Sequence, residues 1–128
     1  MDFIPKQPKL GSSTSVSTFF SKLFELRDTT HVLHLKTKSY AQHMALGGFY
    51  DTILDIADGI IEGYQGLYGI TDFDITSVKA TDPVSYLQEA YKWIESNRSI
   101  FKESWIQNEI DNVQSALAST IYKLVNLK

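Results

Sequence analysis

The fold is decided by residues 15–64, which read SVSTFFSKLFELRDTTHVLHLKTKSYAQHMALGGFYDTILDIADGIIEGY. Apolar side chains recur every three or four positions on both sides of a short polar segment, Lys36 to Ser39. This period is typical of amphipathic helices, and it predicts helices over residues 15–35 and 40–64, the second of them capped by Ser39. Because the polar connection is short, the two helices must fold back on each other as an antiparallel hairpin.

The remainder of the chain predicts a second hairpin. Residues 67–81 are rich in turn-forming and β-branched residues, which favours a crossover loop. Asp82 and Pro83 are a strong start signal for a third helix, with Asp as the cap and Pro in the first position. The segment Asn97-Arg98-Ser99 separates it from a fourth helix that reaches the C-terminus. This order predicts an all-α, ferritin-like four-helix bundle over residues 15–128.

Composition places the chain among soluble globular proteins. Residues 1–14 contain two prolines and two lysines and predict a flexible N-terminal arm. The absence of cysteine excludes disulfides and thiolate metal ligands. With no signal peptide and no apolar stretch of the roughly 20 residues that a membrane span needs, we expect a cytoplasmic protein with no membrane partner.

The charge of the chain argues against a nucleic-acid-binding surface. The formal net charge is −3 and the isoelectric point is about 5.5. Lys6 and Lys9 are the lysines of the arm. Electrostatic affinity for DNA grows with the number of phosphate contacts, so this pair predicts weak or absent DNA binding.

Histidines and acids gather on the first hairpin. His31 and His34 fall at the end of its first helix and His43 at the start of its second, so all three are expected at the same end. The second helix carries a strip of acids: Asp51, Asp55, Asp58 and Glu62. Asp58 and Glu62 are one turn apart and can share an ion. Imidazole with paired carboxylates is the ligand set expected for iron or manganese and, less specifically, zinc.

Distance along the helix decides how these residues can meet. His43 and Asp58 are 15 positions apart, which is about 22 Å at about 1.5 Å per residue, so they cannot bind one ion within a single chain. If two hairpins meet antiparallel about a two-fold axis, the histidines of one chain face Asp58 and Glu62 of the other, and two identical sites form.

The spacing of His31, His43, Asp58 and Glu62 resembles the ferroxidase motif of the Dps family of mini-ferritins. The segment 34–43 is also similar to small Dps-like proteins encoded by bacteriophages. The resemblance implies that two histidines of one subunit meet an Asp and a Glu of its two-fold partner to oxidise Fe(II). It further implies a dimer or a twelve-subunit shell, iron sequestration inside that shell, and a place in the cytoplasm of a bacterial host if the protein is phage-encoded.

The chain departs from that family pattern at three positions. Val32 stands where the family often has Trp, Gly47 where it often has an acid, and Gly63 where it usually has Arg. Gly47 removes a ligand for a second iron, so each site is expected to have one tight iron position and a second that is weak or absent. The alignment leaves two choices for the first histidine ligand, His31 or His34. The alternative function is a metal-free helical scaffold, a phage accessory or structural protein that keeps the fold without the chemistry.

Overall fold

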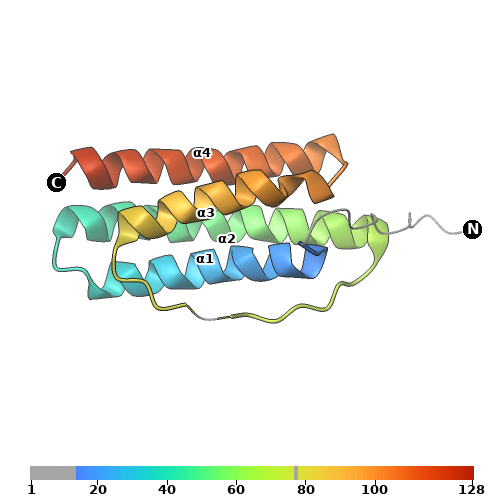
Figure 1. Ribbon diagram of the computed structural model, residues 1–128, viewed down its shortest axis with the longest axis horizontal. Coiled ribbons are helices and arrows are strands. Elements are labelled where there is room, and N and C mark those ends of the chain that lie inside the picture. The colour runs from blue at the N-terminus through green and yellow to red at the C-terminus, as the bar shows by residue number, and fades with distance from the viewer. Residues whose placement is uncertain (1–13, 77) are drawn as a thin grey trace, which may run out of the picture.

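The computed structural model of the protein describes residues 14–76 and 78–128. These residues form α-helices, one short 3-10 turn and no strand (Figure 1), which confirms the all-α prediction. The helical elements are α1 (Val16–Lys36), α2 (Tyr40–Tyr68), α3 (Pro83–Asn97), η1 (Arg98–Ile100) and α4 (Ser104–Asn126).

The predicted N-terminal arm lies outside the described residues, apart from its last position. Lys6 and Lys9, and any contact they make with DNA, are likewise outside them. Thr14, the last residue of the predicted arm, is buried, and its hydroxyl donates a hydrogen bond to the side-chain oxygen of Asn97. The chain is therefore already packed against the α3–α4 corner one residue before the predicted start of the bundle.

The first three helices begin where the local sequence predicts. The side chains of Ser15, Ser39 and Asp82 accept hydrogen bonds from backbone N–H groups in the first turns of α1, α2 and α3. Pro83 occupies the first turn of α3, where its missing N–H costs nothing.

One boundary differs from the prediction. The second helix was expected to end at Tyr64, but α2 continues to Tyr68. Tyr64 and Tyr68 lie one turn apart on the same face and are both buried, so packing extends the helix past Gly66. A glycine inside a helix costs only about 1 kcal/mol, less than burying a tyrosine returns. Gly69 follows with a φ of 90°, a left-handed conformation that favours glycine, and ends the helix.

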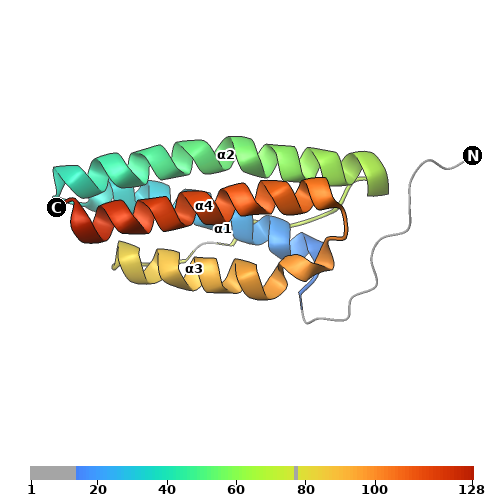
Figure 2. The same ribbon diagram turned by 90° about the horizontal axis from the view of Figure 1, so that it is seen from above.

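The helices pack as two hairpins joined by one long crossover. Helix α1 runs antiparallel to α2, and the chain then returns along α1 to the opposite end before α3 begins (Figure 1). Seen from above, α2 and α3 lie on opposite sides, with α1 and α4 between them (Figure 2). Consequently α2 runs parallel to α3, and α4 antiparallel to α3.

The length of the crossover explains its extended shape. Helix α2 has 29 residues and is therefore about 43 Å long, at about 1.5 Å per residue. The connection from Gly69 to Asp82 must cover nearly that length again. At about 3.3 Å per extended residue it reaches about 46 Å, so it has no slack for a helical turn, and its described residues contain none.

Aromatic side chains fill the core between the crossover and the bundle. Phe20 is fully buried, and its ring meets the edges of Tyr64 and Phe73 at centroid distances of 5.6 Å each. Phe73 belongs to the crossover and also contacts Phe24 of α1 at 5.5 Å. These rings attach the extended connection to the outside of α1.

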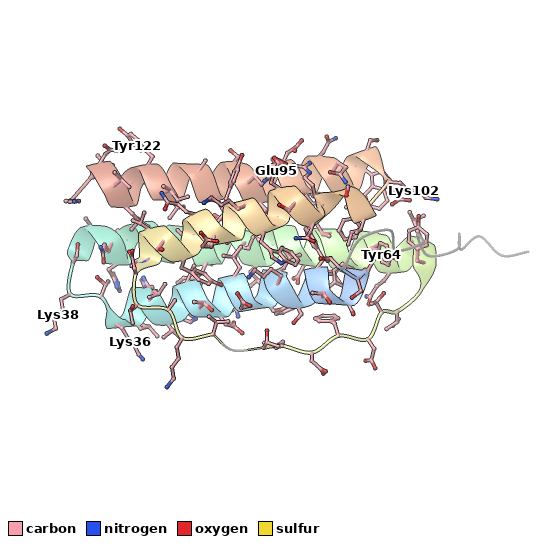
Figure 3. The ribbon with its side chains drawn as sticks, viewed as in Figure 1. Lys36, Lys38, Tyr64, Glu95, Lys102 and Tyr122 are labelled. Atoms are coloured by element: carbon pink, nitrogen blue, oxygen red, sulfur yellow. The ribbon has the colours of Figure 1, made fainter. Side chains whose placement is uncertain are left out.

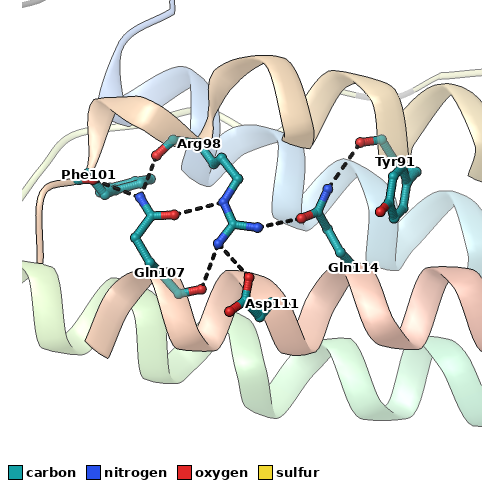
Figure 4. Close-up of polar contacts among 6 residues, drawn as sticks. All are labelled: Tyr91, Arg98, Phe101, Gln107, Asp111 and Gln114. Atoms are coloured by element: carbon teal, nitrogen blue, oxygen red, sulfur yellow. Dashed lines mark hydrogen bonds and ion pairs between the residues drawn. The ribbon is translucent and has the colours of Figure 1, made fainter. Parts of the chain in front are cut away.

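A polar network holds the corner between α3 and α4 (Figure 4). The Arg98 guanidinium donates to Gln107 Oε1 at 2.7 Å, to the Gln107 carbonyl at 2.9 Å and to Asp111 at 2.6 Å. It also donates to the Gln114 side chain, whose amide donates in turn to the Tyr91 carbonyl. The predicted break at residues 97–99 is thus confirmed as the end of α3, followed by η1 and stabilised by an arginine.

Candidate functional site

The structure brings His34 and His43 into direct contact across the first hairpin. Their rings stack with centroids 3.7 Å apart and planes inclined by 20°. Each ring also bonds to the backbone of the other residue: His34 Nδ1 donates to the His43 carbonyl at 2.6 Å, and His43 Nδ1 donates to the His34 carbonyl at 2.9 Å. The two histidines therefore form a reciprocal clamp between the end of α1 and the start of α2.

The clamp determines which ring nitrogens can bind a ligand. A backbone carbonyl only accepts hydrogen bonds, so both Nδ1 atoms carry a proton, and in the neutral rings both Nε2 atoms carry a lone pair. Lone pairs lie in the ring planes. Because these planes are nearly parallel, the two Nε2 atoms do not converge on one ion at a bond length of about 2.1 Å. In this arrangement one ion can be bound by either His34 or His43 but not by both. A second imidazole ligand must therefore come from His31.

His31 lies beside the clamp, three residues before His34 on α1. Its ring stacks on Tyr50 with centroids 4.1 Å apart and planes inclined by 14°. The ring centroid is 6.2 Å from that of His34. Neither His31 nitrogen is hydrogen bonded within the described residues, so both are available to a ligand.

Gly47 is the position at which the absence of a side chain matters for the clamp. A Cβ atom there would lie 2.8 Å from His34 Cε1 and 3.0 Å from His34 Nδ1. The His34 ring occupies the space that the side chain of a larger residue would need. An acid at position 47 and the clamped His34 therefore exclude each other.

The acidic residues lie on the solvent-facing side of α2, and Asp58 and Glu62 among them are far from the histidines. Asp51, Asp55, Asp58 and Glu62 are all exposed, and within the described residues none of them makes an ion pair or a hydrogen bond. Since α2 is one continuous helix from Tyr40 to Tyr68, the separation of about 22 Å between His43 and Asp58 persists in the fold.

Within a single chain the described residues contain no group of three or more His, Asp or Glu side chains that could hold a metal ion. The candidate ligands are thus divided between the two ends of α2. If they bind a metal together, the ion must lie between two chains.

A second polar cluster, at the opposite end of the bundle, has no counterpart in the sequence prediction. The Tyr68 hydroxyl donates a hydrogen bond to Glu103, and burial together with this carboxylate raises the pKa of Tyr68 to about 12. Burial also raises the pKa of Tyr64, whose hydroxyl has no partner among the described residues. The spacing of four between Tyr64 and Tyr68 places both on one face of α2 and is visible in the sequence. Glu103 belongs to the other hairpin, so its contact with Tyr68 is determined only by the tertiary fold.

Comparison with known proteins identifies a family. The described helices define a helical-bundle protein, and none of them is long and apolar enough to cross a membrane. Residues 34–124 match the model of DUF5856, a family of unknown function. The chain belongs to this family. The match begins at His34 and includes His43, Asp58 and Glu62. No curated protein and no solved structure matches the chain.

The role of Gly47 can be tested with a double-mutant cycle. Gly47→Ala should lower the free energy of unfolding by about 1 kcal/mol, because the new methyl group displaces the His34 ring and breaks its hydrogen bond to His43. In a His34→Ala background the same change should raise stability by about 0.5–1 kcal/mol, the ordinary gain of alanine over glycine in a helix. Urea unfolding measures both values.

Gly48→Ala is the matched control, since among the described residues nothing beyond its own stretch of helix lies within 4 Å of the Cβ that it adds. It should raise stability in both backgrounds. If Gly47→Ala were stabilising in the wild-type chain as well, the interpretation of Gly47 as the space for His34 would be wrong.

Proposed function

We propose that this protein is a ferritin-like, Dps-type iron-binding protein that oxidises Fe(II) at a site shared between two chains and then sequesters it. The order of the helices supports this proposal, since two hairpins joined by one long crossover, with α2 parallel to α3, is the arrangement of ferritin-like bundles. The resemblance of the segment from His31 to Glu62 to the Dps motif supplies the chemistry.

The observation that carries the proposal is the distribution of unused ligands on one hairpin. Imidazole nitrogens are available at one end, and Asp58 and Glu62 have no partner at the other end of the same 29-residue helix. When two such hairpins pack antiparallel about a two-fold axis, the histidines of each chain meet Asp58 and Glu62 of the other, which makes two identical sites. Each site would then combine His31 and either His34 or His43 of one chain with Asp58 and Glu62 of the other.

This ligand set fits iron as the substrate. Carboxylate oxygens favour Fe(III) over Fe(II), and neutral imidazole nitrogens hold the ion before oxidation. Two Fe(II) ions each give one electron to a peroxide molecule, which takes up two protons and leaves as two water molecules; dioxygen is the other oxidant of this class. Manganese and zinc are the ions expected to compete for the same ligands.

Iron titration tests the proposal directly. Asp58→Asn and Glu62→Gln should each weaken Fe(II) binding about tenfold or more, since even residues that only support a metal ligand contribute about that much. Asp51→Asn makes the same charge change on the same exposed strip and should leave binding unchanged. Calorimetry under anaerobic conditions measures the affinity, and absorbance of the ferric product after addition of peroxide measures oxidation.

A mixing experiment tests whether the site is shared. His31→Ala/His43→Ala chains and Asp58→Asn/Glu62→Gln chains should each fail to bind iron. If they are unfolded and refolded together, random pairing makes half of the dimers mixed, and each mixed dimer has one intact site. About one quarter of the wild-type sites should therefore return. Light scattering should show at least a dimer, and a stable monomer at micromolar concentration would contradict the proposal.

The second candidate function is a metal-free helical scaffold, and the clamp favours it. His34 and His43 satisfy each other through two ring-to-backbone hydrogen bonds and a stacked contact, which is a sufficient structural role for both. In that case wild type and the acid variants would take up iron equally or not at all. His34→Ala and His43→Ala would still lower the thermal midpoint.

A further inference from the structure

A cavity of about 510 Å³ lies at the histidine end of the bundle, on the other side of α1 from the histidines. Thr29, Val32, Leu33 and Lys36 of α1 line it. At about 100° per residue, the four lining residues fall on the face of α1 opposite to His31 and His34. The remaining walls come from the hairpin loop, the start of α2, residues 78–81 of the crossover and Pro83. Its volume is in the range typical of small-molecule sites.

The charge of the lining is one-sided. Lys36 and Lys79, both exposed, line the cavity, and none of the described Asp or Glu residues lines it, although the chain as a whole is acidic. Neither lysine forms an ion pair within the described part of the chain. Figure 3 shows Lys36 at the end of α1, near the loop that also carries Lys38. Two unpaired ammonium groups beside a cavity without carboxylates attract an anion.

Gln42 adds a donor whose orientation is set by its neighbours. The Thr37 hydroxyl oxygen accepts a hydrogen bond from the Ser39 N–H at 3.1 Å, so its proton is free to donate to Gln42 Oε1 at 2.7 Å. Because Oε1 is the acceptor, the Gln42 Nε2 group is the free end of the amide. It makes no hydrogen bond within the described residues and can donate to a ligand in the cavity.

The rest of the lining is apolar. Val32 and Val78 are 47% and 43% exposed at its rim, and Leu33, Ala80 and Pro83 complete the apolar part of the wall. A purely inorganic anion would leave this surface in contact with water. A ligand with an aliphatic body would cover it and gain from its burial.

We propose that this cavity is a binding site for a small organic anion, a carboxylate on an aliphatic body, which Lys36, Lys79 and Gln42 hold by its charged end. The site is separate from the proposed iron site in position and in chemistry, and it needs neither metal nor a second chain.

Calorimetry on the whole 128-residue chain with octanoate, octanol and acetate tests both halves of the proposal. Octanoate should bind, whereas octanol lacks the charge and acetate lacks the aliphatic body, so each should bind at least about tenfold more weakly. In a ¹H–¹⁵N spectrum, octanoate should shift the side-chain amide resonances of Gln42. Equal affinity for octanol and octanoate, or no binding of octanoate at millimolar concentration, would overturn the proposal.

Variants separate the site from general charge effects. Lys36→Gln/Lys79→Gln should weaken octanoate binding about tenfold, and Ala80→Trp should abolish it by filling the cavity. Lys38 and Lys102, both labelled in Figure 3, do not line the cavity. Lys38→Gln/Lys102→Gln makes the same charge change and should leave binding unchanged. If both lysine pairs reduced binding equally, or Ala80→Trp left it intact with an unchanged thermal midpoint, the anion would bind elsewhere.

Discussion

Replacing Phe20 by alanine should lower the free energy of unfolding by about 4 kcal/mol. Phe20 is fully buried, and its ring contacts Tyr64 of α2, Phe73 of the crossover and Phe101 after η1. Its removal leaves a cavity where three separate parts of the chain meet, and neighbouring rings cannot collapse into it without losing their own contacts. Urea unfolding followed by circular dichroism measures the change.

The crossover provides a second observable for the same variant. Because Phe73 packs on Phe20 and Phe24, loss of Phe20 should increase hydrogen exchange and proteolysis in the described residues on either side of Phe73. Tyr122→Ala removes an aromatic residue that is 58% exposed and should change stability by less than about 0.5 kcal/mol. A Phe20→Ala loss below about 1 kcal/mol would contradict the proposed role of this ring.

Replacing Arg98 by alanine should cost about 3 kcal/mol. The guanidinium is the shared donor to Gln107, Asp111 and Gln114, and its side chain is only 18% exposed. Truncation leaves the Gln107 carbonyl and three side-chain acceptors, on Gln107, Asp111 and Gln114, without their donor. Asp111 is 61% exposed, so its ion pair contributes little, and we assign most of the loss to the hydrogen bonds with the two glutamines.

Arg98→Lys distinguishes geometry from charge. A lysine keeps the positive charge but cannot reproduce the planar arrangement of donors, so it should recover less than half of the loss. The effect should change little between low and high salt, since screened surface charge is a minor part of it. Lys102→Ala, an exposed neighbour in the same corner, should be nearly neutral. Full recovery by lysine would show that charge alone stabilises the corner.

Much of the fold could be predicted from local sequence. The apolar period, the caps Ser39 and Asp82, and Pro83 predicted the starts of the first three helices, because capping and helix propensity depend on residues within one turn. The end of α2 could not be placed in this way. Whether the helix stops near Gly66 or continues to Tyr68 depends on the burial of Tyr68, which the other hairpin provides.

The candidate site likewise has features that the local sequence predicts and features that depend on tertiary packing. The gathering of three histidines at one end, and the separation of His43 from Asp58, could be predicted because helix rise is constant. The clamp could not be predicted. The stacked contact of His34 with His43, and the fit of the His34 ring into the space over Gly47, require the crossing of α1 over α2.

Long-range polar contacts were decided only by tertiary structure. Glu25 is buried, and its carboxylate accepts hydrogen bonds from Lys22 on its own helix and from Tyr86 on α3, 61 positions away. Glu103 likewise meets Tyr68 across 35 positions. No period in the sequence signals such pairs, because a helix pattern records which face is buried but not which side chain of another helix it will contact. That choice is made when the two hairpins pack.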